Sequence, residues 1–236
     1  MNQLNEESFD LQAIAEYKAK YFSGVEKNRE QEVIYIAPPY IQNKRMYLII
    51  KRCFDFLLSL IGLIVLALPM ALIALIIVLD SPGSPIFRQE RLGKNGKPFM
   101  ICKFRSMRMN AETDGPKWAE KEDTRCTRFG AFLRRTRMDE LPQLWNILKG
   151  EMSFVGPRPE RQYFYEVFEK YVIGFSNRLV VVPGLTGYAQ VNGGYDLKPE
   201  EKIIYDMEYI KERSLWFDTK CLIKTFCIVI NGKGAR

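Results

Sequence analysis

One long apolar segment dominates the pattern of hydrophobic and polar positions along this chain. From Phe56 to Leu79 the sequence contains no charged residue, a single serine and a single proline, Pro69. A straight helix of this length would reach about 36 Å, which is enough to cross a hydrocarbon core of about 30 Å. The pattern therefore predicts that this segment lies in lipid.

Basic residues on both sides of the apolar segment argue against a simple span. Lys44, Arg45, Lys51 and Arg52 precede it, and seven further Lys and Arg residues follow it within 88–108. An excess of Lys and Arg favours the cytoplasmic side of a membrane. If the helix crosses the membrane, only one of its two basic flanks can lie on that side. Pro69 removes one helical hydrogen bond, so a bend there would return the chain to the same face. The residues alone leave a plain span and a re-entrant hairpin open.

Shorter periodic segments predict the remaining elements. Residues 8–30 place apolar side chains at near-helical spacing among charges, which favours an amphipathic helix. Residues 86–104 predict two strands joined at Asn95-Gly96, and residues 108–127 resemble a polar loop.

Helices are expected from about Arg128 to Arg135 and from Asp139 to Lys149, with Gly150 as the stop signal. Residues 199–230 mix Tyr, Trp and Phe with Lys and Arg, a composition suited to helices at a membrane interface. Globular helices with aromatic side chains in the core are an equal alternative for this region.

Composition narrows the classes of partner and of chemistry. A net charge of +7 and 47% hydrophobic residues in 236 residues favour one compact domain with an anionic partner. The lipid segment favours an acidic membrane or a phosphorylated substrate, and no nucleic-acid-binding module is recognisable. Five Cys without a CxxC pair suit a reducing cytosol, and the absence of His leaves carboxylates and basic groups to carry any chemistry.

Asp139 and Glu140 form the sharpest candidate site. They follow Arg134, Arg135 and Arg137 at a predicted helix start, where anions are favoured. Nearby positive charge is expected to lower the pKa of the Asp139 carboxyl, so that it stays ionised and can act as a nucleophile or a Mg²⁺ ligand. The simpler alternative is a purely structural role, in which both residues cap the start of the helix.

Three further motifs could contribute to an anion site. In GPRPE (156–160), Arg158 stands between two prolines that stiffen its backbone. Lys103 and Arg105 follow a predicted strand, and the glycines of PGLTG (183–187) permit positive φ angles and a close approach of backbone to ligand. Ordinary surface loops and a solvated strand edge remain the simpler interpretations. P-loop, GxGxxG and Asp-x-Asp signatures are absent.

In combination these motifs carry a resemblance to a known family. KRCFD (51–55), an apolar segment with a central proline, GKPFMICKFRSM, LRRTRMDELPQLWNILKGEMSFVGPRPE and VPGLTGYAQVNG occur in this order. Together they resemble the bacterial sugar transferase family, the monotopic phosphoglycosyl transferases. The resemblance covers about Lys44 to the C-terminus. It implies a re-entrant membrane helix, Mg²⁺ dependence, and transfer of a sugar phosphate from a UDP-sugar to a polyprenyl (undecaprenyl) phosphate.

By position, the resemblance implies that Asp139 is the nucleophile and Glu140 its partner carboxylate, both near the metal. It assigns phosphate binding to Lys103, Arg134 and Arg158, and the bend of the membrane helix to Pro69. Two departures stand out: Leu68 replaces a Ser that often precedes this proline, and Gly194 replaces an Arg common after QVNG. Gly194 is therefore left out of the expected site.

The expected fold is α/β and mostly helical, with a small cytoplasmic domain containing a β-hairpin. We expect a polar extension (1–43), a re-entrant helix (44–80), and a catalytic domain with interfacial C-terminal helices (81–236), at the cytoplasmic face of the bacterial inner membrane. The alternative is a non-catalytic, membrane-anchored module that binds anionic lipid or polymer. The sequence leaves the sugar, the glycan pathway and the existence of a homodimer open.

Overall fold

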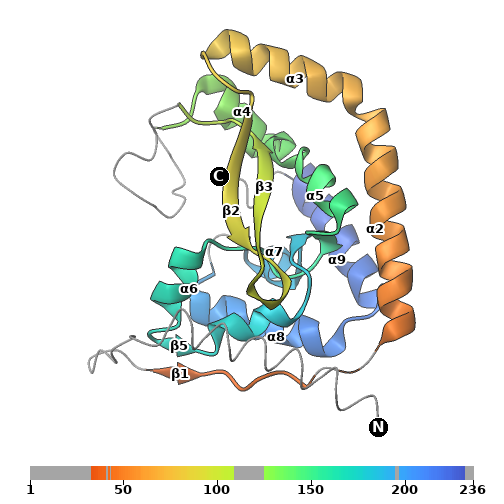
Figure 1. The fold of residues 1–236 in the computed structure, drawn as a ribbon, viewed down its shortest axis with the longest axis vertical. Coiled ribbons are helices and arrows are strands. Elements are labelled where there is room, and N and C mark those ends of the chain that lie inside the picture. Colours follow the sequence, from red (N-terminus) through yellow and green to blue (C-terminus); the bar gives the residue numbers. More distant parts are fainter. Residues whose placement is uncertain (1–32, 41, 43, 109–124, 195–196, 232–236) are drawn as a thin grey trace.

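The computed structural model describes residues 33–40, 42, 44–108, 125–194 and 197–231. The predicted helix at 8–30 and nearly all of the predicted loop at 108–127 lie outside this part of the chain. The described residues are mostly helical with short strands, as the sequence predicts (Figure 1). The α-helices are α2 (Arg45–Val65), α3 (Ala67–Asp80), α4 (Arg128–Thr136), α5 (Gln143–Lys149), α6 (Gln162–Phe168), α7 (Tyr188–Asn192), α8 (Pro199–Glu212) and α9 (Leu215–Ile230).

The strands pair two by two. The hairpin of β2 (Ile86–Leu92) and β3 (Pro98–Phe104) is antiparallel. Two parallel pairs join segments far apart in the sequence, namely β1 (Ile34–Tyr35) with β5 (Val172–Ile173) and β4 (Ser153–Val155) with β6 (Gly184–Thr186). In the described part of the chain the remaining elements are the 3₁₀ segments η1 (Lys94–Gly96), η2 (Met138–Glu140) and η3 (Phe175–Val180).

Two local signals in the sequence are confirmed. The β2–β3 hairpin turns through Asn95 and Gly96, whose φ angles of 56° and 73° are the positive values that Asn-Gly favours. α5 ends at Gly150, whose φ of 86° ends the helix in the left-handed conformation.

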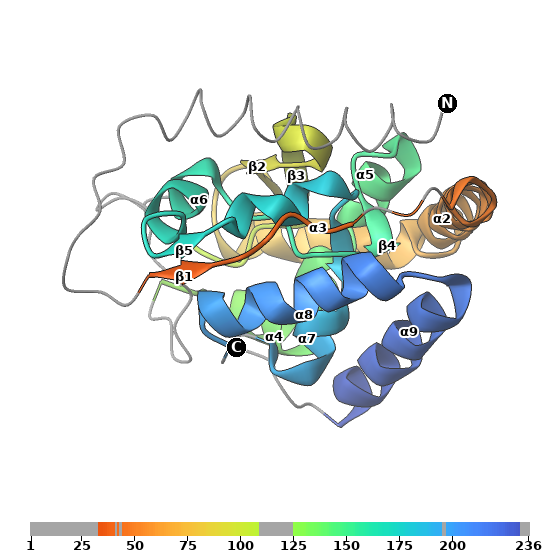
Figure 2. The same cartoon turned by 90° about the horizontal axis from the view of Figure 1, so that it is seen from below.

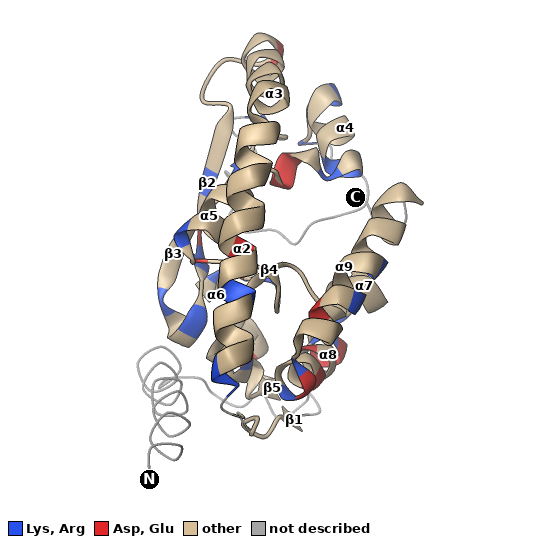
Figure 3. Ribbon diagram, turned by 90° about the vertical axis from the view of Figure 1, so that its right-hand side faces the viewer, with Lys and Arg blue, Asp and Glu red and all other residues tan. Residues whose placement is uncertain are grey.

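Helices α2 and α3 form a bent arm along one side of the molecule (Figure 1). They meet at Leu66 with a bend of 61°. Within the described residues no single helix has the length and apolar character to cross a membrane, although α2 and α3 pass that test as a pair. Figure 3 shows that the charged residues of α2 lie toward its N-terminal half, which leaves the bend apolar.

The bend has a backbone cause and a packing support. Pro69 has no N–H for the Val65 carbonyl, so the regular helical ladder is interrupted at this point. Helical bonding resumes with the Met70 amide donating to the Leu66 carbonyl at 2.8 Å. Leu63 and Leu66 pack against a core cluster of Phe99, Ile101, Leu144, Ile147 and Met152. Leu68 is 70% exposed, so the bend is supported from its inner side.

The start of the arm is attached to the rest of the fold by polar contacts. Lys44 Nζ donates to the Arg213 carbonyl at 2.9 Å, and Lys51 pairs with Asp218 at 2.8 Å. The Arg52 guanidinium donates to the carbonyls of Ile147 and Leu148 at 2.7 Å, at the C-terminal end of α5. These bonds fix α2 on α5 and α9.

The end of the arm returns to the same body. Ile73 and Ile77 of α3 are buried against Phe104 and Leu133. Arg105 donates to the carbonyls at the end of α3, including that of Ser81 at 2.6 Å. Arg105 therefore caps α3, and the expectation that it lines an anion site together with Lys103 is wrong.

The C-terminal helices combine the two alternatives considered for this region. Tyr209 of α8 is buried, and its hydroxyl lies within hydrogen-bonding distance of the Val155 carbonyl and the Asp218 carboxylate, as expected of a core aromatic residue. Trp216 and Phe226 of α9 are 66% and 67% exposed. Figure 2 shows α9 at the edge of the molecule, beside α8. α8 thus contributes to the core, whereas α9 presents an apolar surface.

Candidate functional site

The two adjacent carboxylates lie in a tight turn between two helices. α4 begins at the cap Thr127, whose hydroxyl accepts a hydrogen bond from the Gly130 amide at 2.9 Å, and ends at Arg137 with a φ of 57°. The left-handed residue turns the chain into η2, where Asp139 and Glu140 are each only 8% exposed. α5 starts later than predicted, at Gln143, and neither carboxylate caps it, so the capping interpretation is wrong.

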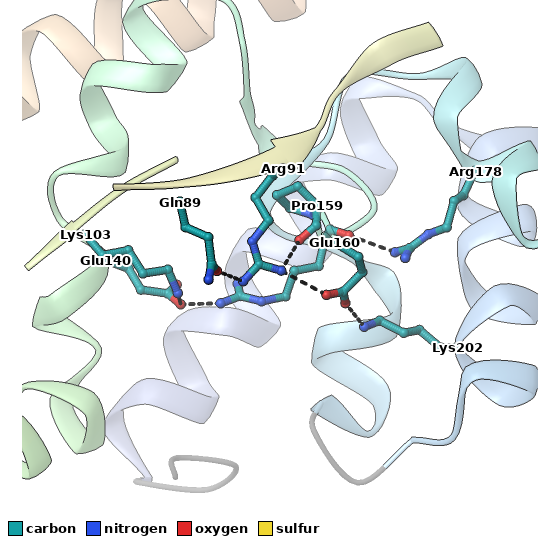
Figure 4. A network of polar contacts seen from close by, with 9 residues as sticks. Gln89, Arg91, Lys103, Glu140, Pro159, Glu160, Arg178 and Lys202 are labelled. Atoms are coloured by element: carbon teal, nitrogen blue, oxygen red, sulfur yellow. Dashed lines mark hydrogen bonds and ion pairs between the residues drawn. The ribbon is translucent and has the colours of Figure 1, made fainter. Parts of the chain in front are cut away.

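Glu140 is held between two cations from different elements. Its Oε1 atom lies 3.2 Å from Lys103 Nζ of β3 and also pairs with the Arg158 guanidinium (Figure 4). Burial by itself raises the pKa of the Glu140 carboxyl, but Arg158 and Lys103 outweigh burial and bring this pKa well below its usual range. Glu140 is therefore a fixed negative charge.

Asp139 has the opposite environment. Burial and the neighbouring Glu140 charge raise the pKa of its carboxyl to about 6, although Lys103, Arg158 and Arg134 oppose the shift. The predicted direction of this pKa shift is wrong, because burial and the Glu140 charge outweigh the nearby cations. Asp139 is still mostly ionised at pH 7. Among the described residues its carboxylate has no hydrogen-bond or ion-pair partner, so it remains available to a ligand.

The structure brings together four of the six predicted residues: Lys103, Asp139, Glu140 and Arg158. Arg134 is close enough to lower the pKa of Asp139, and its Nη1 atom lies 2.9 Å from Cys126 Sγ. Pro69 belongs to the arm and shapes its bend.

The backbone of the GPRPE loop that carries Arg158 is held by hydrogen bonds at each of its five residues. The Gly156 amide donates to the Thr186 carbonyl at 2.9 Å, and each of the next four carbonyls accepts a bond from another element. The donors to residues 157–160 are, in order, the Gly184 amide at 2.9 Å, Arg178 Nη2 at 3.0 Å, Arg91 Nη1 at 3.4 Å and the Leu92 amide at 3.0 Å.

The glycines of PGLTG (183–187) allow a close approach to the GPRPE loop and do not adopt a special φ angle. Gly187 has extended backbone with φ of −178°, and neither it nor Gly184 has positive φ. A Cβ atom on Gly184 would lie 2.1 Å from the Gly156 amide nitrogen, and one on Gly187 would lie 2.1 Å from the Gly156 carbonyl oxygen. The glycines allow the two loops to touch, and neither uses the positive φ angles that glycine permits.

A buried ionic cluster behind the loop was not expected from the sequence. Glu160 accepts from Lys202 at 2.5 Å and from Arg91 at 3.2 Å (Figure 4). Arg178 pairs with Asp206 at 2.6 Å. Burial raises the pKa of the Glu160 carboxyl, but Lys202, Arg91 and Arg178 outweigh it and lower the value to about 2. The one local signal is Arg178 itself, a charge directly before the apolar run Leu179–Val182.

Comparisons with known proteins identify a matching family and several relatives. The model of the family described as bacterial sugar transferase matches residues 46–232, which include the whole carboxylate and cation cluster. One relative is the UDP-N-acetylgalactosamine-undecaprenyl-phosphate N-acetylgalactosaminephosphotransferase of Aeromonas hydrophila. It is 42% identical over 194 residues, which cover 81% of this chain and 46% of the relative.

Two further relatives carry related names. A Bacillus subtilis (strain 168) protein, provisionally named an undecaprenyl-phosphate N-acetylgalactosaminyl 1-phosphate transferase, is 56% identical over 134 residues, or 56% of this chain and 74% of the relative. The UDP-glucose:undecaprenyl-phosphate glucose-1-phosphate transferase of Escherichia coli (strain K12) is 42% identical over 182 residues, which cover 75% of this chain and 39% of the relative. This chain spans less than half of the Aeromonas and Escherichia proteins. With most of its length matched by the family model, the chain belongs to the bacterial sugar transferase family.

Proposed function

We propose that the protein transfers a sugar-1-phosphate from a UDP-sugar to a polyprenyl phosphate, such as undecaprenyl phosphate, and releases UMP. The observation that carries this proposal is the buried carboxylate pair, in which Glu140 is neutralised by two cations while Asp139 has no ion-pair partner in the described part of the chain. The names of the relatives support the same reaction, which would be the first membrane step in assembling a bacterial glycan.

In the first step an Asp139 carboxylate oxygen attacks the sugar-linked phosphorus of the UDP-sugar. The bond from this phosphorus to the bridging oxygen breaks, and UMP leaves with the electron pair. The product on the protein is a sugar-phosphoryl aspartate. In the second step a phosphate oxygen of the lipid attacks the same phosphorus and displaces the Asp139 carboxylate, so two easier displacements replace one difficult transfer.

The surrounding cations would stabilise the phosphoryl group during both displacements. Lys103 and Arg158 already converge on Glu140, and Arg134 contributes positive charge at Asp139. Charge-assisted bonds from such groups to phosphoryl oxygens act most strongly where water is excluded. Glu140 would keep Lys103 and Arg158 oriented between turnovers.

Asp139 and Glu140 also fit a Mg²⁺ site. Mg²⁺ is commonly held by one or two carboxylates together with substrate phosphates rather than by a complete protein cage. Within the described residues no group of three or more metal-ligating side chains is found, which agrees with a site completed by substrate. When bound, Mg²⁺ would supply positive charge to the diphosphate of the donor.

We further propose that the arm of α2 and α3 is a re-entrant membrane helix. Both of its ends are attached to one folded body, through Lys51 and Arg52 at one end and Arg105 at the other. A straight span would carry these ends to opposite faces of the bilayer. At the bend Ile64, Val65 and Leu68 are 68–70% exposed, as expected of a lipid-facing surface.

The exposed side of α9 would lie on the membrane surface beside the arm. Trp216 lies on this helix with Lys220 Nζ 5.4 Å from its ring centroid, a combination suited to the headgroup region. This arrangement would place the active site at the cytoplasmic face of the inner membrane. There a water-soluble donor meets a lipid acceptor.

Lipid-dependent release of UMP tests the proposal directly. Purified protein in membrane mimetics is offered a panel of UDP-sugars with and without undecaprenyl phosphate, and UMP is measured. Sustained UMP release with one sugar and only in the presence of lipid phosphate is expected, and it identifies the sugar. Binding of anionic lipid without UMP release for any donor would favour the non-catalytic, membrane-anchored module.

A further inference from the structure

Arg178 is a fully buried arginine that touches the backbone of the loop carrying Arg158. It lies in η3 with 1% of its surface exposed, and its guanidinium carbon is 4.9 Å from the ring centroid of Phe175. Its Nη2 atom donates to the Arg158 carbonyl at 3.0 Å (Figure 4). The same atom lies 2.6 Å from Asp206 Oδ2. Arg178 thus joins α8 to one peptide group of the loop.

Stability alone is a poor reason for this arrangement. Removing two charges from water costs several kcal/mol per ion, and apolar side chains of similar volume often stabilise a protein as well as or better than a buried ion pair. What apolar side chains cannot supply is a hydrogen-bond donor to the Arg158 carbonyl. The ψ torsion of Arg158 sets the direction of this carbonyl. The neighbouring residues Pro157 and Pro159 have fixed φ angles.

We propose that Arg178 is a positioning residue for Arg158. By holding the Arg158 carbonyl, it fixes the torsion from which the Arg158 side chain extends toward Glu140 and, in turnover, toward a substrate phosphate. Asp206 holds Arg178 in place from α8. The inference rests on the proposed function, because it assigns the Arg158 guanidinium to the transferring phosphoryl group.

A double-mutant cycle on UMP release tests this assignment. Arg178→Met/Asp206→Leu removes both buried charges together, so no uncompensated charge is left in the core. Because a misplacement of about 1 Å can cost about 100-fold in rate, we expect kcat/KM to fall about 10-fold to 100-fold when Arg158 is present. In an Arg158→Ala background the same change should cost less than about 3-fold, because the positioned group is gone.

Two variants keep the test decisive. Leu179→Ala, at the next position of η3, removes a buried side chain that makes no polar contact with the loop. It calibrates general destabilisation and should act by the same factor in both Arg158 backgrounds. Arg178→Lys keeps a positive charge beside Asp206 with a shorter side chain. This variant replaces the double variant in the cycle if the double variant does not fold.

The outcomes separate the two proposals. A loss on changing Arg178 that is equal in both backgrounds, as for Leu179→Ala, would overturn the positioning role and leave the proposed function intact. Unchanged kcat/KM in Arg158→Ala alone would overturn the role of Arg158 in the reaction, and the positioning role with it. Strong non-additivity confined to the Arg178 variants would support the inference.

Discussion

Asp139 and Glu140 are adjacent carboxylates, equally buried at 8% exposure, whose pKa values move in opposite directions. Glu140 forms ion pairs with two cations, Arg158 and Lys103, and the pKa of its carboxyl falls. Burial and the Glu140 charge disfavour the ionised form of Asp139, so the pKa of its carboxyl rises to about 6. The pair is thereby divided into one carboxylate that is held in place and one that is free to react.

Replacing Asp139 by Asn should abolish turnover without unfolding the protein. The amide has nearly the same size and needs no counter-charge, but it cannot form the acyl phosphate. We expect UMP release to fall by at least about 1,000-fold, as for loss of other catalytic nucleophiles. Wild-type protein incubated with UDP-sugar and no lipid should gain the mass of one sugar phosphate at Asp139, measured by peptide mass spectrometry.

Two results would speak against this role. Near wild-type turnover of the Asn variant would exclude Asp139 as the nucleophile. An inactive Asn variant without any trappable adduct in the wild type would indicate instead a direct displacement, in which Asp139 acts as a metal ligand.

Chelation should stop the reaction, and Mg²⁺ should restore it. The reason is that the site provides hard oxygen ligands in Asp139 and Glu140, which suit Mg²⁺ better than softer metals. UMP release is measured after exhaustive treatment with EDTA and again after addition of Mg²⁺. Full activity in excess EDTA would refute metal assistance, while the circular dichroism spectrum serves as the control for folding.

Both ends of the helical arm should be accessible from the cytoplasm. Tyr40 is 72% exposed before the arm, and Lys97 is exposed in the turn after it. In a protein whose five native cysteines are replaced by alanine, Tyr40→Cys and Lys97→Cys should react with a membrane-impermeant maleimide only in inside-out vesicles. Leu68→Cys at the bend should be protected in both vesicle orientations.

Labelling of one end from the periplasmic side would establish a span and contradict the re-entrant arm. Replacing Pro69 by Leu restores the missing N–H and should straighten the segment. We expect this variant to move part of the population toward a spanning topology in the same labelling assay, with lower UMP release.

The surface of α9 should lie in the headgroup region. With Trp118 and Trp145 replaced by Phe, the fluorescence of Trp216 reports this position alone. Brominated lipids should quench Trp216 strongly when the bromine is close to the headgroup and less when it is at the chain end. Quenching only by an aqueous quencher such as acrylamide would place α9 away from the bilayer.

Glu160 should stabilise the protein at neutral pH and lose this effect in acid. Its pKa is lowered from 4.5 to about 2 in the folded protein, so its contribution is complete above pH 4.5 and disappears as the pH falls toward 2. Glu160→Gln should therefore lower the free energy of unfolding by about 3 kcal/mol at pH 7. The two proteins should converge in thermal unfolding experiments as the pH is lowered through this range.

A surface carboxylate provides the matched control. Glu212 pairs with Lys211 at 3.8 Å, and both side chains are more than half exposed. Glu212→Gln should change stability little at any pH, because exposed pairs are screened by water and salt. An equal effect of the two substitutions would show that the buried cluster around Glu160 adds nothing to stability.

Local sequence determined the features that depend on a few neighbouring residues. The turn at Asn95-Gly96 and the helix end at Gly150 follow from the φ angles that these residues tolerate. Pro69 likewise marked the place where the apolar segment could bend, since a missing N–H acts within one helical turn, although the residues alone left a straight span open. The residue types at Asp139, Glu140, Lys103 and Arg158 were sufficient to mark a candidate site.

Tertiary structure alone decided which charges meet and what their pairing does. Lys103 and Arg105 lie two residues apart, yet one reaches Glu140 and the other caps α3. The direction of the Asp139 pKa shift was predicted wrongly, because burial and the allocation of cations to Glu140 are properties of the assembled fold. The buried pairing of Arg178 with Asp206 is equally non-local. Desolvation and ion pairing act over a few ångströms in space, and residues distant in the chain supply both.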